Sequence, residues 1–348
     1  MVILGIDAHK RTHTIVAVDE LGRKLGERCI TASRSDHLAL LGWAEGLGCP
    51  RLWAVEDCRH LSRHLERDLL GAGEVIVRVP PKLMAHSRDA ARTFGKSDPI
   101  DALAVARAAL REPELPTARL EGPERDIRLL LSHREDLVAE RTRIINRLRW
   151  HLHDLDPSWE PPARGLIQAK HQAAVEARLD GVPGLEARLA RELVARCRDL
   201  TSHVDELEDE IKALVIPLAP SLLAICGCGA LSAAKIVGET AGAQRFRSKD
   251  AFARHNGTAP IPVWSANHVR HRLNRAGNRQ LNAALHRIAL TQARHDPSAR
   301  AYLDRRRAGG KTGTEAMRCL KRRLSDVVFR ALVADAAASI SRPEALVA

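Results

Sequence analysis

Four acidic residues in the first third of the chain have the residue type and the spacing of a divalent-metal site. Asp7 ends the apolar stretch "VILGID", Glu56 ends "LWAVE", and Asp98 and Asp101 stand together in "SDPIDALAVA". Two metal ions roughly 3.5 to 4 Å apart need several hard oxygen ligands and must leave positions for a phosphate and a nucleophile. Apart from His9, no histidine or thiol belongs to this set, so it favours Mg²⁺ or Mn²⁺ over zinc and predicts phosphoryl transfer.

Helix capping is an alternative explanation for two of these acids. Asp98 has the residue type of an N-cap, Pro99 suits the first helical position, and Asp101 falls in the first turn, where the helix dipole favours an anion. Their i, i+3 spacing also puts both carboxylates on one helix face. Capping explains this pair without a metal, but it does not explain why two earlier strands also end in carboxylates.

The segments around the acids predict a mixed sheet with helices packed on it. Residues 1–32 have the β-branched alternation of three short strands, with a turn signal at "DELG". A helix at about 36–47, a strand at 52–57, a helix at about 60–71 and a strand at 74–79 follow, and a further helix begins in "KSDPID". If the first and fourth strands are neighbours, Asp7 and Glu56 converge at their carboxyl ends, where open sheets hold their sites.

The middle of the chain has the seven-residue periodicity of two long amphipathic helices. One aliphatic stripe runs from Leu131 to Leu152, and a second runs from Cys197 to Leu214, after a break at "DPSWEPPARG". The two helices could pair with each other or with a second subunit, and the heptads alone leave both arrangements open. A structural spacer is the expected role.

The positive charge of the chain is concentrated at its C-terminal end. The net charge is +12, and residues 251–348 hold 18 Lys and Arg against 6 Asp and Glu, so the rest of the chain is balanced. Such polarisation predicts a surface that binds nucleic acid, through charge and duplex shape, since aromatic residues amount to only 3%. A Gly/Pro-containing loop, "HNGTAPIPVWSANHVRHRLNRAGN", and helices are expected here. The predicted contacts are Gly227, Gly229, Arg270, Arg272, Arg275, Asn278, Arg279 and Arg287.

Each of these contacts also has a structural alternative. Arginines at helical spacing are often a solvated helix face, and guanidinium groups equally suit bidentate phosphate contacts. The glycines of "ICGCGALSAAKIVG" are similar to a helix-hairpin-helix element, in which backbone N–H groups approach a phosphate, but a simple turn between helices explains them as well.

The sequence has none of the features expected of a membrane protein or a secreted protein. No apolar run approaches the roughly 20 residues of a spanning helix, the N-terminus has no signal-peptide pattern, and seven scattered cysteines form no C-x-x-C pair. We therefore expect a cytoplasmic protein.

The motifs together resemble one protein family along nearly the whole chain. "GIDAHK", the strand that ends in "VED", "GKSDPIDALAVA" and "NGTAPIPVWS" followed by "LNRAGNRQL" are similar, in the same order, to the DEDD insertion-sequence transposases. The resemblance implies an α/β RNase H/RuvC-like domain with a mixed sheet in residues 1–116. It also implies a helical coiled-coil connector in 117–216 and a mainly helical, basic transposase domain in 217–348.

The same resemblance implies an activity and site residues. Asp7, Glu56, Asp98 and Asp101 correspond to the metal-binding tetrad, and Ser265, which follows the Gly-x-Ala-Pro turn at 257–260, corresponds to a nucleophilic serine. A DNA-phosphoserine link would conserve phosphodiester energy between cutting and rejoining. The implied partners are donor and target double-stranded DNA and a structured guide RNA, with a dimer or tetramer acting on the bacterial nucleoid.

Two other functions remain compatible with the residues. A RuvC-like junction nuclease would use the acids to activate water and leave Ser265 inert. A catalytically dead nucleic-acid-binding protein would keep the fold and the basic surface without the chemistry, although the presence of all four acids argues against it.

Overall fold

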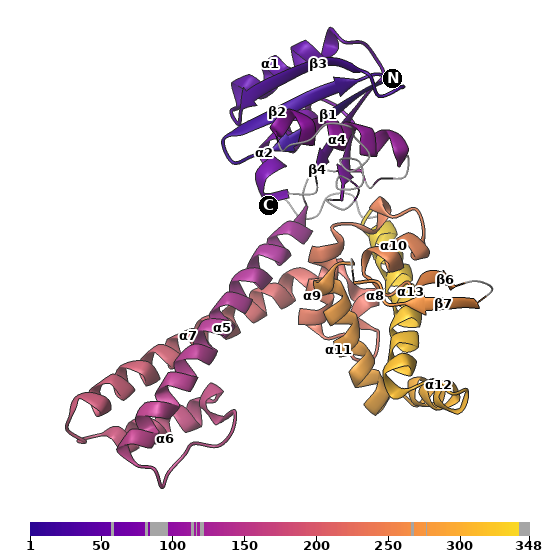
Figure 1. Ribbon diagram of the computed structural model, residues 1–348. Helices are drawn as coiled ribbons and strands as arrows, with labels where there is room; N and C mark the ends of the chain where they lie inside the picture. Colours follow the sequence, from indigo (N-terminus) through magenta and orange to yellow (C-terminus); the bar gives the residue numbers. More distant parts are fainter. Residues whose placement is uncertain are drawn as a thin grey trace. The chain divides into compact units, whose positions relative to one another are not determined.

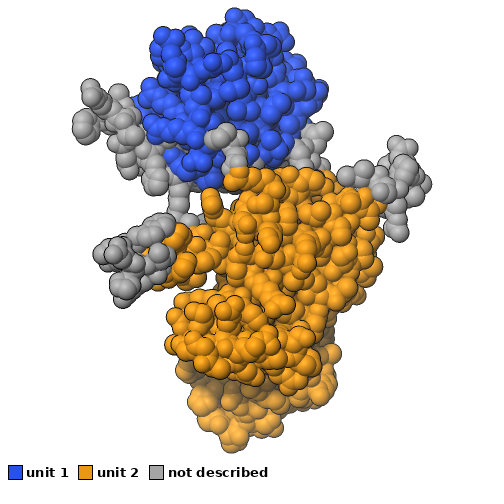
Figure 2. Space-filling model, turned by 90° about the vertical axis from the view of Figure 1, so that its right-hand side faces the viewer, with its two compact units in different colours: residues 1–121 blue, residues 122–348 orange. Residues whose placement is uncertain are grey.

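A computed structural model describes residues 1–56, 59–80, 83, 97–112, 115, 117–118, 122–265, 268–275 and 277–340. The chain divides into two compact units, residues 1–121 and residues 122–348, which Figure 2 shows in blue and orange. None of the described helices combines the length and the apolarity that a membrane crossing requires.

The first unit is built on one five-stranded mixed sheet (Figure 1). The strand order is β3-β2-β1-β4-β5, with β1, β2 and β3 antiparallel and with β1, β4 and β5 parallel. The central strand is buried along its whole length, as expected for a strand covered on both faces. This order matches the expected RNase H/RuvC-like class. The strands are β1 Val2–Ala8, β2 Thr12–Val18, β3 Lys24–Thr31, β4 Arg51–Glu56 and β5 Ile76–Val79.

Helices cover both faces of this sheet. Helices α1 (Arg34–Glu45) and α2 (Arg59–Gly71) pack on one face, in a core that includes Leu4 and Ile6. Helix α4 (Asp98–Arg111) packs on the opposite face. These bounds agree with the predicted helices within two residues, because the apolar spacing and the flanking polar residues mark them clearly.

Gly5 of β1 allows an unusually close approach between α4 and the sheet. A Cβ atom at this position would lie 2.2 Å from the carbonyl oxygen of Ala102 and 2.4 Å from the backbone nitrogen of Ala106. Ala102 and Ala106 are themselves fully buried, so small residues form both sides of the contact. The first turn of α4 is thereby held beside the carboxyl end of β1.

The second unit begins with a long antiparallel helix pair, in which Figure 1 shows α5 and α7 side by side. Helix α5 (Pro123–Leu155) and helix α7 (Leu185–Leu218) are joined by Arg134–Glu208 (2.6 Å) and Arg196–Glu140 (2.8 Å) ion pairs. The two heptad stripes therefore pack against each other within one chain. A short 3-10 helix (Gly165–Ile167) and α6 (Ala169–Leu179) close the far end over a small apolar core.

The remainder of the second unit is a helical domain with its own core. The described elements are α8 Pro220–Leu223, α9 Ala230–Thr240, a 3-10 helix Ala243–Arg245, α10 Lys249–His255, β6 Ile261–Ser265, β7 His268–Arg272, α11 Arg279–His295, α12 Pro297–Ala308 and α13 Gly313–Ile340. The core joins α9, α11 and α13 to the base of the α5/α7 pair through residues such as Ile127, Ile211 and Ile288.

The predicted loop at 255–278 is in part a β-hairpin, which corrects that expectation. Strands β6 and β7 pair antiparallel, with Ile261 opposite Arg272 and Ser265 opposite His268. The sequence signal for a strand is present in "IPVWS", where β-branched Ile261 and Val263 alternate with other residues, and is weak in "HVRHR", whose one β-branched residue is Val269. The Gly and Pro residues on the N-terminal side of these segments favour a loop. In the structure they mark only the entry to the hairpin.

Candidate metal centre and nucleic-acid interface

Asp7 and Glu56 end neighbouring parallel strands at the same edge of the sheet. The ladder between β1 and β4 puts these two residues at corresponding positions, directly after its last paired residues. Because side chains alternate along a strand, Asp7 lies on the face of Gly5 and Glu56 on the face of Ala54, which α4 covers. The expected adjacency of the two strands is confirmed.

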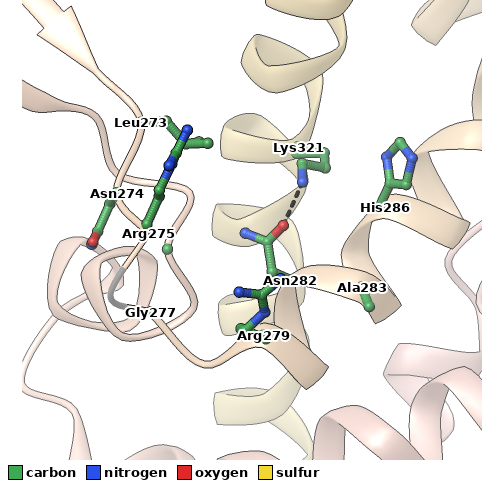
Figure 3. Close-up of a pocket in the computed structure, with 10 residues that line it drawn as sticks. Leu273, Asn274, Arg275, Gly277, Arg279, Asn282, Ala283, His286 and Lys321 are labelled. Carbon is green, nitrogen blue, oxygen red and sulfur yellow. Dashed lines mark hydrogen bonds between the residues drawn. The ribbon is translucent and has the colours of Figure 1, made fainter.

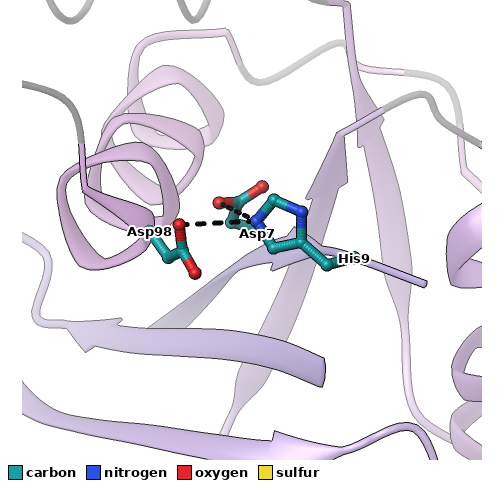
Figure 4. A group of neighbouring side chains, drawn as sticks. All are labelled: Asp7, His9 and Asp98. Carbon is teal, nitrogen blue, oxygen red and sulfur yellow. Dashed lines mark hydrogen bonds and ion pairs between the residues drawn. The ribbon is translucent and has the colours of Figure 1, made fainter. Parts of the chain in front are cut away.

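Three side chains meet at the carboxyl end of β1, as Figure 4 shows. His9 Nε2 lies 3.1 Å from Asp7 Oδ2 and 3.5 Å from Asp98 Oδ1, and the ligand atoms of the three residues all lie within 4.8 Å of one another. The Asp7 side chain is buried, whereas those of His9 and Asp98 are about half exposed. One buried carboxylate and two accessible groups form a cluster that could hold a metal ion.

The electrostatics of Asp7 reflect this crowding. Burial raises the pKa of the Asp7 carboxyl above its ordinary value; nearby His9 opposes the rise, and the negative charges of Asp101 and Asp98 add to it. Asp101 is therefore close enough to act on Asp7, although neither it nor Glu56 belongs to the group within 4.8 Å. A cation at this place would relieve the repulsion between the carboxylates.

The start of α4 differs from the capping expectation. Ser97 occupies the N-cap position, Asp98 is the first helical residue, and within the described residues no side chain caps this end. The predicted N-cap role of Asp98 is therefore wrong: the chain enters the helix one residue earlier, and the Asp98 carboxylate turns to His9 instead. Pro99 and Asp101 lie in the first turn as expected.

His9 is the site residue that the sequence interpretation left out of the tetrad. It stands two residues after Asp7, just beyond the end of β1, where its backbone N–H donates to Thr12 O across the tight connection to β2. The signal that could have found it is its place in "GIDAHK", since that turn must bring its side chain back to the edge of the sheet.

Ser265 is the last residue of β6 and lies in the second unit, whereas the acids lie in the first. Its backbone pairs with His268 of β7. The hairpin thus ends its first strand at the predicted nucleophile, next to a turn whose residues fall outside the described ranges.

Two of the predicted arginines line a basic pocket in the second unit (Figure 3). The pocket has a volume of about 590 Å³ and includes Arg275 and Arg279. Arg270 and Arg272 belong to strand β7, and Arg287 lies exposed on α11 outside the pocket lining. Asn278 caps α11, because its side chain accepts from Leu281 N at 3.0 Å and donates to Glu239 Oε2 at 2.7 Å.

The two glycines before α9 differ in their surroundings. Gly227 has a φ of +83°, and a Cβ there would lie 2.8 Å from Thr291 Cβ and 3.1 Å from Ile288 O, so close packing against α11 requires glycine. Gly229 is the N-cap of α9 and faces open space. Gly227 has a sufficient structural reason, and Gly229 is the more accessible of the two.

The mixed sheet, with acids at the carboxyl edge of β1 and at the start of α4, defines the first unit as an RNase H/RuvC-like domain. Two transposase family models match the chain: a DEDD transposase model of the IS110 type over residues 4–157, and a transposase model of the IS116/IS110/IS902 family over residues 219–304. The chain belongs to this family of DEDD insertion-sequence transposases.

Relatives of similar length accompany these matches. The chain is 28% identical to the IS116 44.8 kDa protein of Streptomyces clavuligerus and 26% identical to the IS900 42 kDa protein of Mycobacterium paratuberculosis, each alignment covering 94% of both chains. It is 25% identical to the transposase for IS1111A of Coxiella burnetii, over 84% of this chain and 78% of that protein. A solved structure of Thermus thermophilus RuvC with a Holliday junction aligns with 17% identity and a TM-score of 0.27, over 32% of this chain and 94% of RuvC.

Proposed function

We propose that this protein cuts and rejoins double-stranded donor and target DNA by metal-assisted phosphoryl transfer. The observation that carries this proposal is the meeting of Asp7, His9 and Asp98 at the carboxyl end of β1, in a chain that belongs to a transposase family. Carboxylates crowded at one sheet edge are unfavourable by themselves, and such sites are suited to divalent cations.

The four acids fit Mg²⁺ or Mn²⁺ in their donor chemistry. Asp7, Glu56, Asp98 and Asp101 offer hard carboxylate oxygens, and the raised pKa of Asp7 reflects the burial and the carboxylate repulsion that a cation would offset. When bound, a divalent ion would neutralise charge on the phosphate that reacts. In this proposal His9 orients Asp7 and Asp98, because its Nε2 lies between the two carboxylates.

Ser265 is the proposed nucleophile. Its Oγ would form a bond to a DNA phosphorus, the bond from that phosphorus to one deoxyribose oxygen would break, and the hydroxyl proton would leave to a base. The phosphodiester energy is then kept in a DNA-phosphoserine link, and the hydroxyl of another strand end can attack it to rejoin the DNA. The family motif supports this assignment, since Ser265 follows the Gly-x-Ala-Pro turn at 257–260.

The proposed division of labour follows the chain. Residues 1–116 would hold the metal, 117–216 would form a coiled-coil connector, and 217–348 would supply the serine and the basic surface. We propose phosphate contacts for the residues predicted from the sequence, with a structured guide RNA supplying sequence specificity and a dimer or tetramer providing several active sites on the nucleoid. The proposed contacts are Gly227, Gly229, Arg270, Arg272, Arg275, Asn278, Arg279 and Arg287.

A suicide substrate tests the covalent step. The full chain is incubated with Mg²⁺ and nicked DNA that carries the ends of its own element, and protein–DNA adducts are resolved on denaturing gels. We expect an adduct with the native chain and with the control Ser298→Ala, an exposed serine of α12, and no adduct with Ser265→Ala. Metal-dependent cleavage that survives Ser265→Ala without any adduct would show a RuvC-like nuclease instead.

Sequencing of co-purified nucleic acid tests the guide. We expect one discrete RNA encoded beside the gene of this protein to be recovered from its host with the full chain. Recovery of only heterogeneous cellular RNA would contradict the guided mechanism and leave the covalent step to be judged by the adduct assay.

A further inference from the structure

The basic pocket of the second unit has a lining whose ionisable side chains are all bases. Helix α11 contributes Arg279 and His286, helix α13 contributes Lys321, and the loop after β7 contributes Arg275. Among the described residues that line the pocket there is no carboxylate. A pocket of about 590 Å³ is large enough for a phosphate group with part of its sugar.

Lys321 is a half-buried cation whose hydrogen-bond partner in the described structure is a neutral amide. Its Nζ donates to Asn282 Oδ1 at 2.6 Å, and Figure 3 shows this bond at the centre of the pocket. Burial lowers the pKa of Lys321, and the neighbouring positive charge of Arg318 lowers it further. A partly desolvated ammonium without a counter-ion is unfavourable, so an anion at this place would be stabilised.

The cations of the pocket are not used in ion pairs within the described parts of the chain. Lys321, Arg275 and Arg279 have no carboxylate within 4 Å there. The next residue along α13 behaves differently: Arg322 pairs with Asp250 at 2.5 Å and also with Asp326. The charge of Arg322 beside the pocket is therefore neutralised by carboxylates, whereas Lys321 inside the pocket can bind an anion.

The walls of the pocket are fixed by tight backbone contacts. A Cβ on Gly277 would lie 2.2 Å from the backbone nitrogen of Gly257, so the loops before and after the β6/β7 hairpin touch here. Asn282 Nδ2 donates to Asn256 O at 2.8 Å, and Asn256 Nδ2 donates to Ser325 Oγ at 2.8 Å. Because these bonds join α11, α13 and both loops, the cations need little rearrangement to receive a ligand.

The β6/β7 hairpin has its base at this pocket: β6 begins near it and β7 ends at it. Gly257 lies four residues before β6, and Leu273 directly follows Arg272, the last residue of β7. Five residues of strand span roughly 16 Å, which is well under the roughly 34 Å of one duplex turn. A single nucleic-acid segment can therefore contact the pocket and the end of β6, where Ser265 lies.

We propose that this pocket binds one phosphate of a nucleic-acid backbone through Lys321, Arg275 and Arg279, and so holds the strand at the base of the hairpin that carries Ser265. The proposal deepens the function proposed above and rests on it for the role of Ser265, whereas phosphate binding itself does not depend on catalysis. In this proposal Lys321 is a positioning residue rather than a catalytic one.

Binding measurements on the full chain test the pocket. Fluorescence anisotropy with a labelled DNA duplex compares the native chain with Lys321→Met and Arg275→Gln at several salt concentrations. We expect each variant to weaken binding roughly tenfold and to make the salt dependence shallower by about one counterion, because one phosphate contact is lost. The matched control is Arg294→Gln, an exposed arginine of α11 without a described partner, for which we expect a change under about twofold.

Two further arms keep the result interpretable. Lys321→Arg should restore most of the affinity if the charge acts, whereas a folding defect would be shared by both substitutions and would appear as a lowered melting temperature. Inorganic phosphate, titrated by calorimetry, should bind the native chain and not Lys321→Met. If phosphate binds but duplex affinity is the same in both chains, the pocket serves free anions and the proposal is overturned.

The outcomes separate this proposal from the proposed function. Ser265→Ala should lose the covalent adduct and keep its duplex affinity, while Lys321→Met should need a higher DNA concentration than the native chain for half-maximal adduct formation. Duplex affinity equal to that of the native chain in Lys321→Met and Arg275→Gln would reject the pocket and leave the serine assignment standing. Weakened binding in both variants, with no adduct from the native chain, would support the phosphate pocket and reject the assignment of Ser265 as nucleophile.

Discussion

Asp7 is a buried carboxylate that the chain places beside two other acids and a histidine. Burial and the negative charges around it oppose its ionisation, and His9 offsets only part of this effect. Side chains arranged in this way cost stability, so their presence at one sheet edge indicates a role other than folding. Glu66, another buried acid of the first unit, is by contrast satisfied internally, because Ser62 and Arg78 both donate to its carboxylate.

Asp101 is the acid whose replacement separates catalysis from folding most clearly. Asp101→Asn keeps the side-chain shape and removes one negative charge that acts on Asp7. We expect strand transfer to fall by roughly 100-fold or more and the free energy of unfolding to change by less than about 1 kcal/mol. Activity assays and thermal unfolding measure the two effects. The control is Asp126→Asn, an exposed acid in the first turn of α5, and equal activity of the two variants would return Asp101 to a helix-dipole role.

His13 predicts a pH dependence of stability in the first unit. Burial, with the positive charges of His37 and His9 adding, lowers the pKa of His13 to about 4. Between pH 6.5 and 4 the unfolded chain binds a proton at this site that the folded chain does not, so stability falls as the pH falls through this range. The loss should approach about 3 kcal/mol, and denaturant unfolding measures it. His13→Leu should remove this part of the slope, and an unchanged slope in that variant would contradict the assignment.

Among the elements, the contact between β1 and α4 positions the acidic cluster. Gly5 permits the approach, and it was not among the residues predicted to matter, because a glycine in a strand gives no hint of which helix will lie over it. The predicted sheet and helices were confirmed, since their periodicity is local. The hairpin β6/β7 was expected as a loop, and the N-cap of α4 was expected at Asp98 instead of Ser97. Both depend on how the chain enters the element.

A methyl group at Gly5 should separate α4 from the sheet. In Gly5→Ala the new Cβ would meet Ala102 O and Ala106 N, and backbone cannot yield cheaply there. We expect a loss of about 3 kcal/mol in unfolding free energy together with loss of strand transfer, because the acids of α4 would move away from Asp7. Gly42→Ala in α1 is the control: a Cβ there meets no atom within 4 Å, and stability should rise slightly. Equal melting temperatures for the two variants would contradict the close approach.

At the scale of the whole molecule, the two units differ in what they can bind. The acidic cluster belongs to residues 1–121, whereas the excess of positive charge lies in residues 251–348, within the second unit. Each unit has its own apolar core, so the fold of each unit supports its charged surface without the other unit. This separation fits the proposed function, in which the second unit binds nucleic acid and the first unit holds a metal ion.

The charge distribution predicts how binding depends on salt. Duplex affinity of the full chain should fall steeply as salt rises from 50 to 200 mM, and a chain of residues 122–348 should keep most of that dependence. Anisotropy titrations measure both, with circular dichroism confirming that the shorter chain remains helical. If residues 1–121 instead account for the salt dependence, the basic surface is not the main nucleic-acid contact.

The sequence by itself determined the sheet and helices of the first unit, the heptad stripes, the charge polarity and the family, because these depend on residue type and near-neighbour spacing. Asp7, Glu56, Asp98 and Asp101 could be chosen for the same reason. Only the tertiary structure decided that His9 stands between two of the acids, that the heptad helices pair within one chain, and that Lys321 faces Arg275 across a pocket. These relations join residues through packing and long-range backbone contacts, which local sequence patterns do not specify.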